Sequence, residues 1–110
     1  MRRHLLVGLG IALSVCSLSA ATLERLSLDE MAGKFKPDLI MISAGFDSHQ
    51  GDPLGQLLLE DEDFVHLTRT VKEWAQQACN GRIVSCLEGG YNLQTLGQTV
   101  RAHVEELARS

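Results

Sequence analysis

The run Asp38-Leu39-Ile40-Met41-Ile42-Ser43-Ala44-Gly45-Phe46-Asp47 decides the fold that this chain can adopt. Its apolar part, Leu39 to Ile42, is continuous instead of alternating, which is typical of a parallel strand covered on both faces. After this run, Gly45, Gly51, Pro53 and Gly55 exclude regular structure. Ligands of open α/β sheets bind beyond the carboxyl ends of the strands. Asp47 stands at that end, although aspartate is also common as a turn or cap residue.

A second stretch repeats this pattern. Arg82 to Leu87 is a short apolar run, and the loop Glu88 to Leu93 follows it. A helical pattern from Asp61 to about Ala78 lies between the two runs. The crossover of such a strand–helix–strand unit is almost always right-handed, so both loops leave the sheet on the same side. Neighbouring strands lie ~4.8 Å apart, so the sequence predicts that Asp47 and Tyr91 face one crevice.

The helices are predicted from the spacing of their apolar residues. The helix from Asp61 to about Ala78 begins with acidic residues that complement its dipole, and Asn80-Gly81 supplies its end. A last helix is predicted from Leu93 to Ala108, and a short one from Leu23 to Lys34. The apolar face of the first helix consists of Phe64, Leu67, Val71, Trp74, Ala75 and Ala78. The inner stripe of the last helix consists of Leu96, Val100, His103, Val104 and Leu107.

Three motifs in this order resemble a known family. They are SAGFD at residues 43–47, GDPLG at 51–55 and LEGGYNL at 87–93. They are similar to the C-terminal motifs of the zinc-dependent histone deacetylase and acetylpolyamine amidohydrolase superfamily, in the form of its class II and bacterial members. The resemblance runs from about Phe35 to about Leu107. It implies an α/β fold in which this parallel βαβ unit is a fragment of an arginase-like three-layer domain.

The resemblance also implies roles for single residues. Asp47 matches the second aspartate ligand of the catalytic zinc, and Tyr91 matches the tyrosine whose hydroxyl stabilises the tetrahedral intermediate. Leu54 matches a residue in the wall of the acyl-lysine pocket, beside Gly89 and Gly90. The implied cofactor is Zn²⁺, and the implied substrates are acetyl-lysine or acetylated polyamines. Without the resemblance, Tyr91 would be interpreted as an ordinary aromatic residue in a loop.

The zinc motifs that this family carries upstream are missing from their usual place. There is no pair of adjacent histidines, and the one Asp-x-His is Asp47-Ser48-His49, whose aspartate matches the other ligand. A two-stranded parallel sheet is also marginal by itself. We therefore expect residues 22–110 to be the C-terminal portion of a deacetylase domain, inactive without the rest. The alternative is a non-catalytic truncated fragment or an interaction module.

Residues 1–21 differ from everything that follows. Arg2 and Arg3 precede an uncharged run from Leu5 to Ala21 that ends in small residues, which is the layout of a secretory signal peptide. The competing interpretation is an artefact of the gene start. A genuine leader predicts export, or membrane attachment if it is not cleaved, whereas the family resemblance favours the cytoplasm.

Composition excludes some functions. The formal charge of the 110 residues is −4 and no basic patch is present, so nucleic-acid binding has no support. A nucleotide-binding domain is disfavoured because no glycine-rich phosphate loop joins strand to helix. Cys79 and Cys86 lack metal or redox spacing and are predicted to be small buried hydrophobes. His66 and His103 are predicted on helix surfaces or flanks, and His49 on the rim of the crevice.

Overall fold

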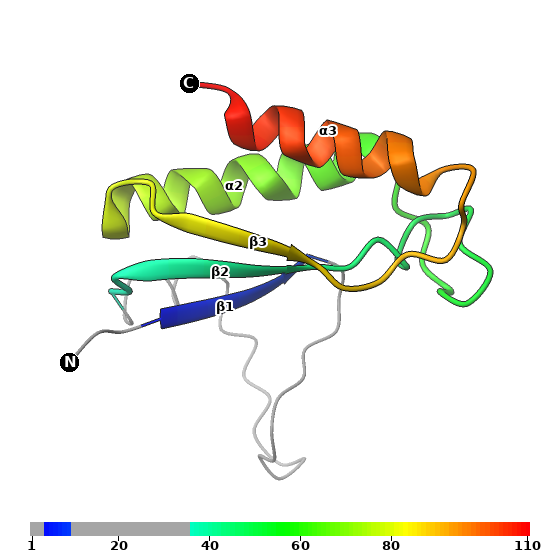
Figure 1. Ribbon diagram of the computed structural model, residues 1–110, viewed down its shortest axis with the longest axis horizontal. Helices are drawn as coiled ribbons and strands as arrows, with labels where there is room; N and C mark the ends of the chain where they lie inside the picture. Colours follow the sequence, from blue (N-terminus) through cyan, green and yellow to red (C-terminus); the bar gives the residue numbers. More distant parts are fainter. Residues whose placement is uncertain (1–3, 10–35) are drawn as a thin grey trace, which may run out of the picture.

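The fold is a parallel sheet with two helices on one of its faces (Figure 1). The computed structural model describes residues 4–9, as backbone, and residues 36–110. The elements are β1 (His4–Leu9), β2 (Leu39–Ala44), α2 (Asp61–Cys79), β3 (Ile83–Leu87) and α3 (Leu96–Ala108). The sheet order is β1-β2-β3, with both pairings parallel. The βαβ unit β2-α2-β3 is therefore confirmed, whereas the helix predicted from Leu23 to Lys34 lies outside the described residues.

Strand β1 is not predicted from the sequence. It pairs with β2 in a register that runs from His4 opposite Leu39 to Leu9 opposite Ala44. Five of its six residues, Leu5 to Leu9, fall in the uncharged run that resembles a signal peptide, and this composition does not indicate a strand. Whether residues 1–21 are a leader stays a prediction.

Strand β2 is buried on the face that carries the helices. Ile40, Ile42 and Ala44 are at most 2% exposed and belong to the core under α2, whereas Met41 between them is 37% exposed. The expectation that both faces of this strand are covered is not met by the described residues. The reason is that α2 and α3 lie on the same side of the sheet (Figure 1). Val84, the partner of Met41 on β3, is also exposed.

Helix α2 forms as the sequence predicts and extends one residue further. Its acidic first turn includes Asp63, whose carboxylate accepts a hydrogen bond of 2.8 Å from the backbone N–H of Glu60. At the other end, Asn80 and Gly81 adopt positive φ angles of 54° and 72°. The Gly81 N–H then donates to the carbonyl of Ala75, which closes the helix as a left-handed cap. Four residues of the predicted inner face are buried, namely Phe64, Val71, Trp74 and Ala75, whereas Leu67 and Ala78 are half-buried. Thr68 and Cys79 are buried as well.

Helix α3 packs on α2 through a polar contact that apolar spacing does not predict. His103 is 3% exposed, which agrees with its place in the predicted inner stripe and shows that the expected position on a helix flank is wrong. The Thr68 hydroxyl donates to the carbonyl of Phe64, so it accepts a bond of 2.8 Å from His103 Nδ1–H. His103 Nε2 then accepts a bond of 2.9 Å from the Ser85 hydroxyl. One neutral imidazole thus ties α2, α3 and β3 together, and its burial lowers the pKa of His103.

The inner stripe of α3 is shifted from the predicted one. Val104 is 53% exposed, and Glu106 is buried instead. Glu106 forms an ion pair with Arg69 on α2, with 3.0 Å between Oε1 and Nε. Because its charge is paired, Glu106 can occupy an inward position, whereas the spacing of apolar residues predicts Val104 there. Cys79 is buried, but Cys86 is exposed, which corrects its predicted burial. Among the described residues, no helix is long and apolar enough to span a membrane.

Candidate active site

The loops that follow β2 and β3 are joined directly beyond the strand ends. The N–H of Glu88 donates to the carbonyl of Ala44 at 2.9 Å, and the N–H of Phe46 donates to the carbonyl of Gly89 at 2.8 Å. These two bonds continue the ladder between β2 and β3 past the last strand residues. The two loops that the sequence places at one edge of the sheet are therefore neighbours in space.

Asp47 lies where these two loops meet. A Cβ added to Gly89 would come within 3.0 Å of Asp47 Oδ1, so the carboxylate rests against the backbone of the second loop. The GDPLG turn folds back onto the same residue, because a Cβ on Gly55 would lie only 1.5 Å from the carbonyl oxygen of Asp47. Both glycines are thus needed for close approach to one aspartate. The structure brings Asp47, Gly55 and Gly89 together, and the metal-binding role of Asp47 stays a prediction.

Gly55→Ala tests this close approach. We expect it to lower the free energy of unfolding by about 1–3 kcal/mol, the usual scale of overpacking, because the loop must move to clear the Asp47 carbonyl. The matched control is Gly97→Ala in α3, where an added Cβ has nothing within 4 Å. That change should stabilise the chain by up to about 1 kcal/mol. Urea unfolding of both variants measures the difference, and equal midpoints would contradict the packing of Gly55.

Tyr91 is held by its backbone more than by its side chain. Its side chain is 53% exposed, while Gly90 before it has a φ of 133°, a conformation that favours glycine. A Cβ on Gly90 would also meet Leu96 Cδ1 at 2.5 Å. Leu54, the predicted wall residue, is 68% exposed in the neighbouring turn. The structure thus places Tyr91 and Leu54 on adjacent loops, both open to solvent.

Asp52 is a residue of this region to which the sequence alone assigned no role. It is 8% exposed, and its carboxylate accepts hydrogen bonds from the N–H groups of Leu54 (2.8 Å), Gly55 (3.0 Å) and Tyr91 (2.7 Å). Burial by itself raises the pKa of the Asp52 carboxyl, but these donors, together with the backbone N–H of Asn92, outweigh it and leave the pKa below its ordinary value. An aspartate before Pro53 is a common turn signal, and that signal predicts the bonds within the turn but not the one to Tyr91.

His49 is part of the loop framework and does not lie on an open rim. It is 9% exposed, and its ring stacks on Phe64 with centroids 6.3 Å apart. Its Nδ1 accepts a hydrogen bond of 3.0 Å from the Gly51 N–H, and its Nε2 lies 3.6 Å from Asp61. The expected rim position is therefore wrong, because both ring nitrogens have partners inside the fold. His66 is exposed on α2, as predicted.

The described residues do not form a complete metal site. No group of three or more His, Cys, Asp or Glu side chains within residues 36–110 could hold a metal ion. A catalytic zinc normally has three protein ligands. Asp47 has the right chemistry for one of them, so this part of the chain fits zinc only as a contributor.

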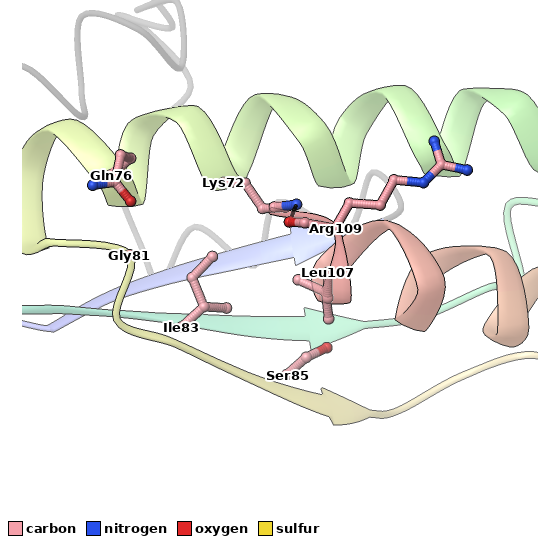
Figure 2. Close-up of a pocket in the computed structure, with 7 residues that line it drawn as sticks. All are labelled: Lys72, Gln76, Gly81, Ile83, Ser85, Leu107 and Arg109. Atoms are coloured by element: carbon pink, nitrogen blue, oxygen red, sulfur yellow. Dashed lines mark hydrogen bonds between the residues drawn. The ribbon is translucent and has the colours of Figure 1, made fainter.

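A cavity of about 340 Å³ lies elsewhere, between α2, β3 and α3 (Figure 2). Its lining includes Gly81 and Ile83, at the beginning of β3, whereas the candidate site follows the ends of the strands. The Lys72 ammonium in its wall donates to the backbone carbonyls of Glu106 and Arg109, each at 2.6 Å. None of the residues that line this cavity belongs to the loops around Asp47, so it is distinct from the candidate site.

Comparison with known proteins gives the family. The family described as "Histone deacetylase domain" matches residues 17–107. The chain belongs to the histone deacetylase family. The three motifs place the start of the resemblance at about Phe35, whereas the family match begins at residue 17. It therefore includes residues 17–21 of the leader-like segment. The fold class and the family inferred from the three motifs are thus confirmed.

Relatives and a solved structure agree with this assignment. The chain is 46% identical over 74 residues to type-2 histone deacetylase 1 of Dictyostelium discoideum, covering 67% of this chain and 5% of the relative. It is 46% identical over 77 residues to polyamine deacetylase HDAC10 of Mus musculus, covering 70% and 11%. The crystal structure of the HDA15 HD domain matches with a TM-score of 0.61 and 35% identity, covering 70% of this chain and 20% of that one. The chain therefore spans a small part of these proteins.

Proposed function

We propose that residues 36–107 form the carboxyl-terminal part of the catalytic centre of a deacetylase that hydrolyses acetyl-lysine or acetylated polyamine amides. The observation that carries the proposal is the junction of the two loops. The Asp47 carboxylate lies so close to Gly89, two residues before Tyr91, that a Cβ added there would be 3.0 Å from its Oδ1. Both loops follow neighbouring parallel strands, and ligands of such sheets bind at this edge.

Tyr91 is the group that would act on the substrate. Amide hydrolysis passes through a tetrahedral intermediate whose oxygen carries negative charge, and a hydroxyl placed beside it donates a hydrogen bond. Such a donor contributes about 3–4 kcal/mol to stabilising the transition state. The exposed side chain of Tyr91 leaves its hydroxyl free to meet a substrate from the solvent side. Leu54, exposed on the adjacent turn, is placed to contact the aliphatic part of an acyl-lysine or acyl-polyamine chain.

Zinc is the cofactor that we propose for the complete domain. When bound, it would supply a polarised carbonyl and a water of lowered pKa. Asp47 would be one of its protein ligands, because an anionic oxygen at this position suits zinc and its backbone is fixed by the Gly55 turn. The other ligands must come from residues outside those described here, since residues 36–110 offer no complete set.

A chimera tests the proposal. In this chimera, residues 36–107 replace the matching segment of mouse polyamine deacetylase HDAC10, to which the chain is 46% identical. We expect the chimera to hydrolyse an acetylated polyamine within about tenfold of the mouse enzyme, since losing a single catalytic donor costs at least ~100-fold. A soluble, folded chimera without measurable hydrolysis would contradict the proposal.

The 110-residue chain alone is the control for the second candidate function, a non-catalytic fragment or interaction module. This candidate is favoured by the absence of a complete ligand set within residues 36–110. We expect the isolated chain to lose zinc on dialysis and to leave a fluorogenic acetyl-lysine substrate intact. Stoichiometric zinc that survives dialysis, together with turnover that a hydroxamate abolishes, would show that the chain is a compact enzyme.

A further inference from the structure

We propose that Asp52 is the positioning residue for Tyr91: its carboxylate holds the backbone of the tyrosine loop on the turn that carries Leu54. This inference rests on the function proposed above, because positioning has a purpose only if Tyr91 and Leu54 act on a substrate. It assigns no contact between Asp52 and the substrate. What it assigns is the placement of the Tyr91 backbone relative to the turn that carries Leu54.

The first support is that the two carboxylate oxygens of Asp52 accept hydrogen bonds from different segments of the chain. Asp52 Oδ1 accepts the N–H groups of Leu54 and Gly55, at 2.8 and 3.0 Å, and so closes the turn. Asp52 Oδ2 accepts the N–H of Tyr91 at 2.7 Å. Bonds from N–H groups to a charged acceptor are shorter and about twice as strong as neutral ones. One buried carboxylate therefore links two segments that lie 39 positions apart in the sequence.

The second support is that the tyrosine side chain has little else to fix it. Tyr91 is 53% exposed, so about half of its surface makes no packing contact. The residues on either side are anchored to the first loop. The Gly89 carbonyl accepts from Phe46 N–H, and the side-chain amide of Asn92 (Nδ2) donates to the Gly51 carbonyl at 2.6 Å. The bond to Asp52 lies between these two anchors and acts on Tyr91 itself.

The third support is the free-energy cost of burying the charged carboxylate of Asp52. An aspartate that is 8% exposed is retained only if its lone pairs are satisfied. Two of its three donors would close the turn without any partner from the second loop. The third donor belongs to the one residue in that loop to which the family resemblance gives a catalytic role. The Tyr91 N–H therefore satisfies Asp52 Oδ2, which the two turn donors do not reach, and in doing so it joins the tyrosine loop to the turn.

Amide hydrogen exchange of the ¹⁵N-labelled 110-residue chain tests the inference without any need for catalysis. Asp52→Asn keeps an oxygen for the turn but replaces the acceptor of Tyr91 by an NH₂ group. We expect exchange at Tyr91 N–H to rise about tenfold or more, the scale of one hydrogen bond to a charged group. Exchange at the Leu54 and Gly55 N–H groups should stay near the parental rate. Asp52→Ala removes both acceptors and should raise the exchange rates at all three.

Two comparisons separate positioning from general loss of stability. Exchange at the Val71 amide in the core of α2 serves as the internal reference, and Asp63→Asn, which removes a carboxylate that caps α2, serves as the control variant. The control should leave the Tyr91-to-Val71 ratio unchanged. A ratio that Asp52→Asn also leaves unchanged would overturn the inference. If neither Asp52 variant folds, the exchange rate of the Tyr91 amide in the unmodified chain decides the question. A rate as fast as in an unstructured peptide would overturn the inference, and protection of the Tyr91 amide would support it.

Failure of this inference is distinguishable from failure of the proposed function. An unresponsive Tyr91 amide rejects the role of Asp52 but leaves the activity of the chimera untouched. An inactive chimera rejects the function, while the exchange pattern still shows whether Asp52 holds the tyrosine loop.

Discussion

Tyr91→Phe in the chimera should lower kcat for an acetylated polyamine by about 100-fold to 1,000-fold. The change removes one hydroxyl from a side chain that is half exposed, so the fold should not be disturbed. It also leaves the backbone N–H of Tyr91 on Asp52, so the loop keeps its position. Loss of one donor to the developing oxyanion has an effect of this size on kcat in other hydrolases. The measurement is steady-state hydrolysis together with the zinc content of the purified protein.

The zinc content decides what a loss of activity means. Tyr91 is not assigned as a ligand, so the Tyr91→Phe chimera should keep the parental amount of zinc. Leu93→Ala is a suitable control, since Leu93 follows in the same loop and is 86% exposed. We expect less than a tenfold change in its kcat, because it removes no hydrogen-bond donor. Hydrolysis by Tyr91→Phe at the parental rate would refute the role given to this hydroxyl.

The local pattern of the sequence predicts most of the described fold. Continuous apolar runs predict β2 and β3, and the spacing of Phe64, Val71 and Trp74 predicts α2 with its correct face. These features are local, so a short window of sequence contains the physical information that determines them. The Asn80-Gly81 cap is predicted for the same reason, since it depends only on residues that tolerate positive φ.

Features that depend on distant partners are not predictable in this way. His103 is buried because Thr68 and Ser85 supply a partner to each ring nitrogen, and both lie on other elements. Glu106 turns inward because Arg69 on α2 pairs with it. Glu106 occupies an interior position that apolar counting gives to Val104, whereas His103 belongs to the predicted stripe and only its two partners are unpredicted. The pairing offsets the cost of burial, and it becomes visible only when the helices are placed together.

The candidate site shows the same division. The strand–loop order places Asp47 and Tyr91 at one edge of the sheet, and the pairing of β2 with β3 confirms that their loops are neighbours. The motif GDPLG is recognisable by its resemblance to a family, whereas the contribution of Asp52 depends on a bond to Tyr91 across 39 positions. No short window of the sequence contains both partners of that bond.

Asp47→Asn in the chimera should reduce zinc affinity by at least about 100-fold and remove most of the activity. Substitutions in the outer shell of a metal site already cost ~10–100-fold in affinity, and a direct ligand that loses its charge should cost at least as much. Asparagine has nearly the same shape, so the carboxamide can occupy the same position against Gly89 and the Gly55 turn can still close on the backbone of residue 47. The expected loss therefore comes from charge and not from packing.

Competition with a zinc chelator of known affinity measures the change, and hydrolysis is followed in the same samples. Asp63→Asn is the matched control, because it also removes one negative charge, from the beginning of α2 and outside the candidate site. It should lower stability slightly, by about 1 kcal/mol for a lost cap, and leave zinc affinity unchanged. Parental zinc affinity in Asp47→Asn would place the metal elsewhere. Weak zinc binding in both variants would instead point to unfolding, which thermal melting of the two proteins detects directly.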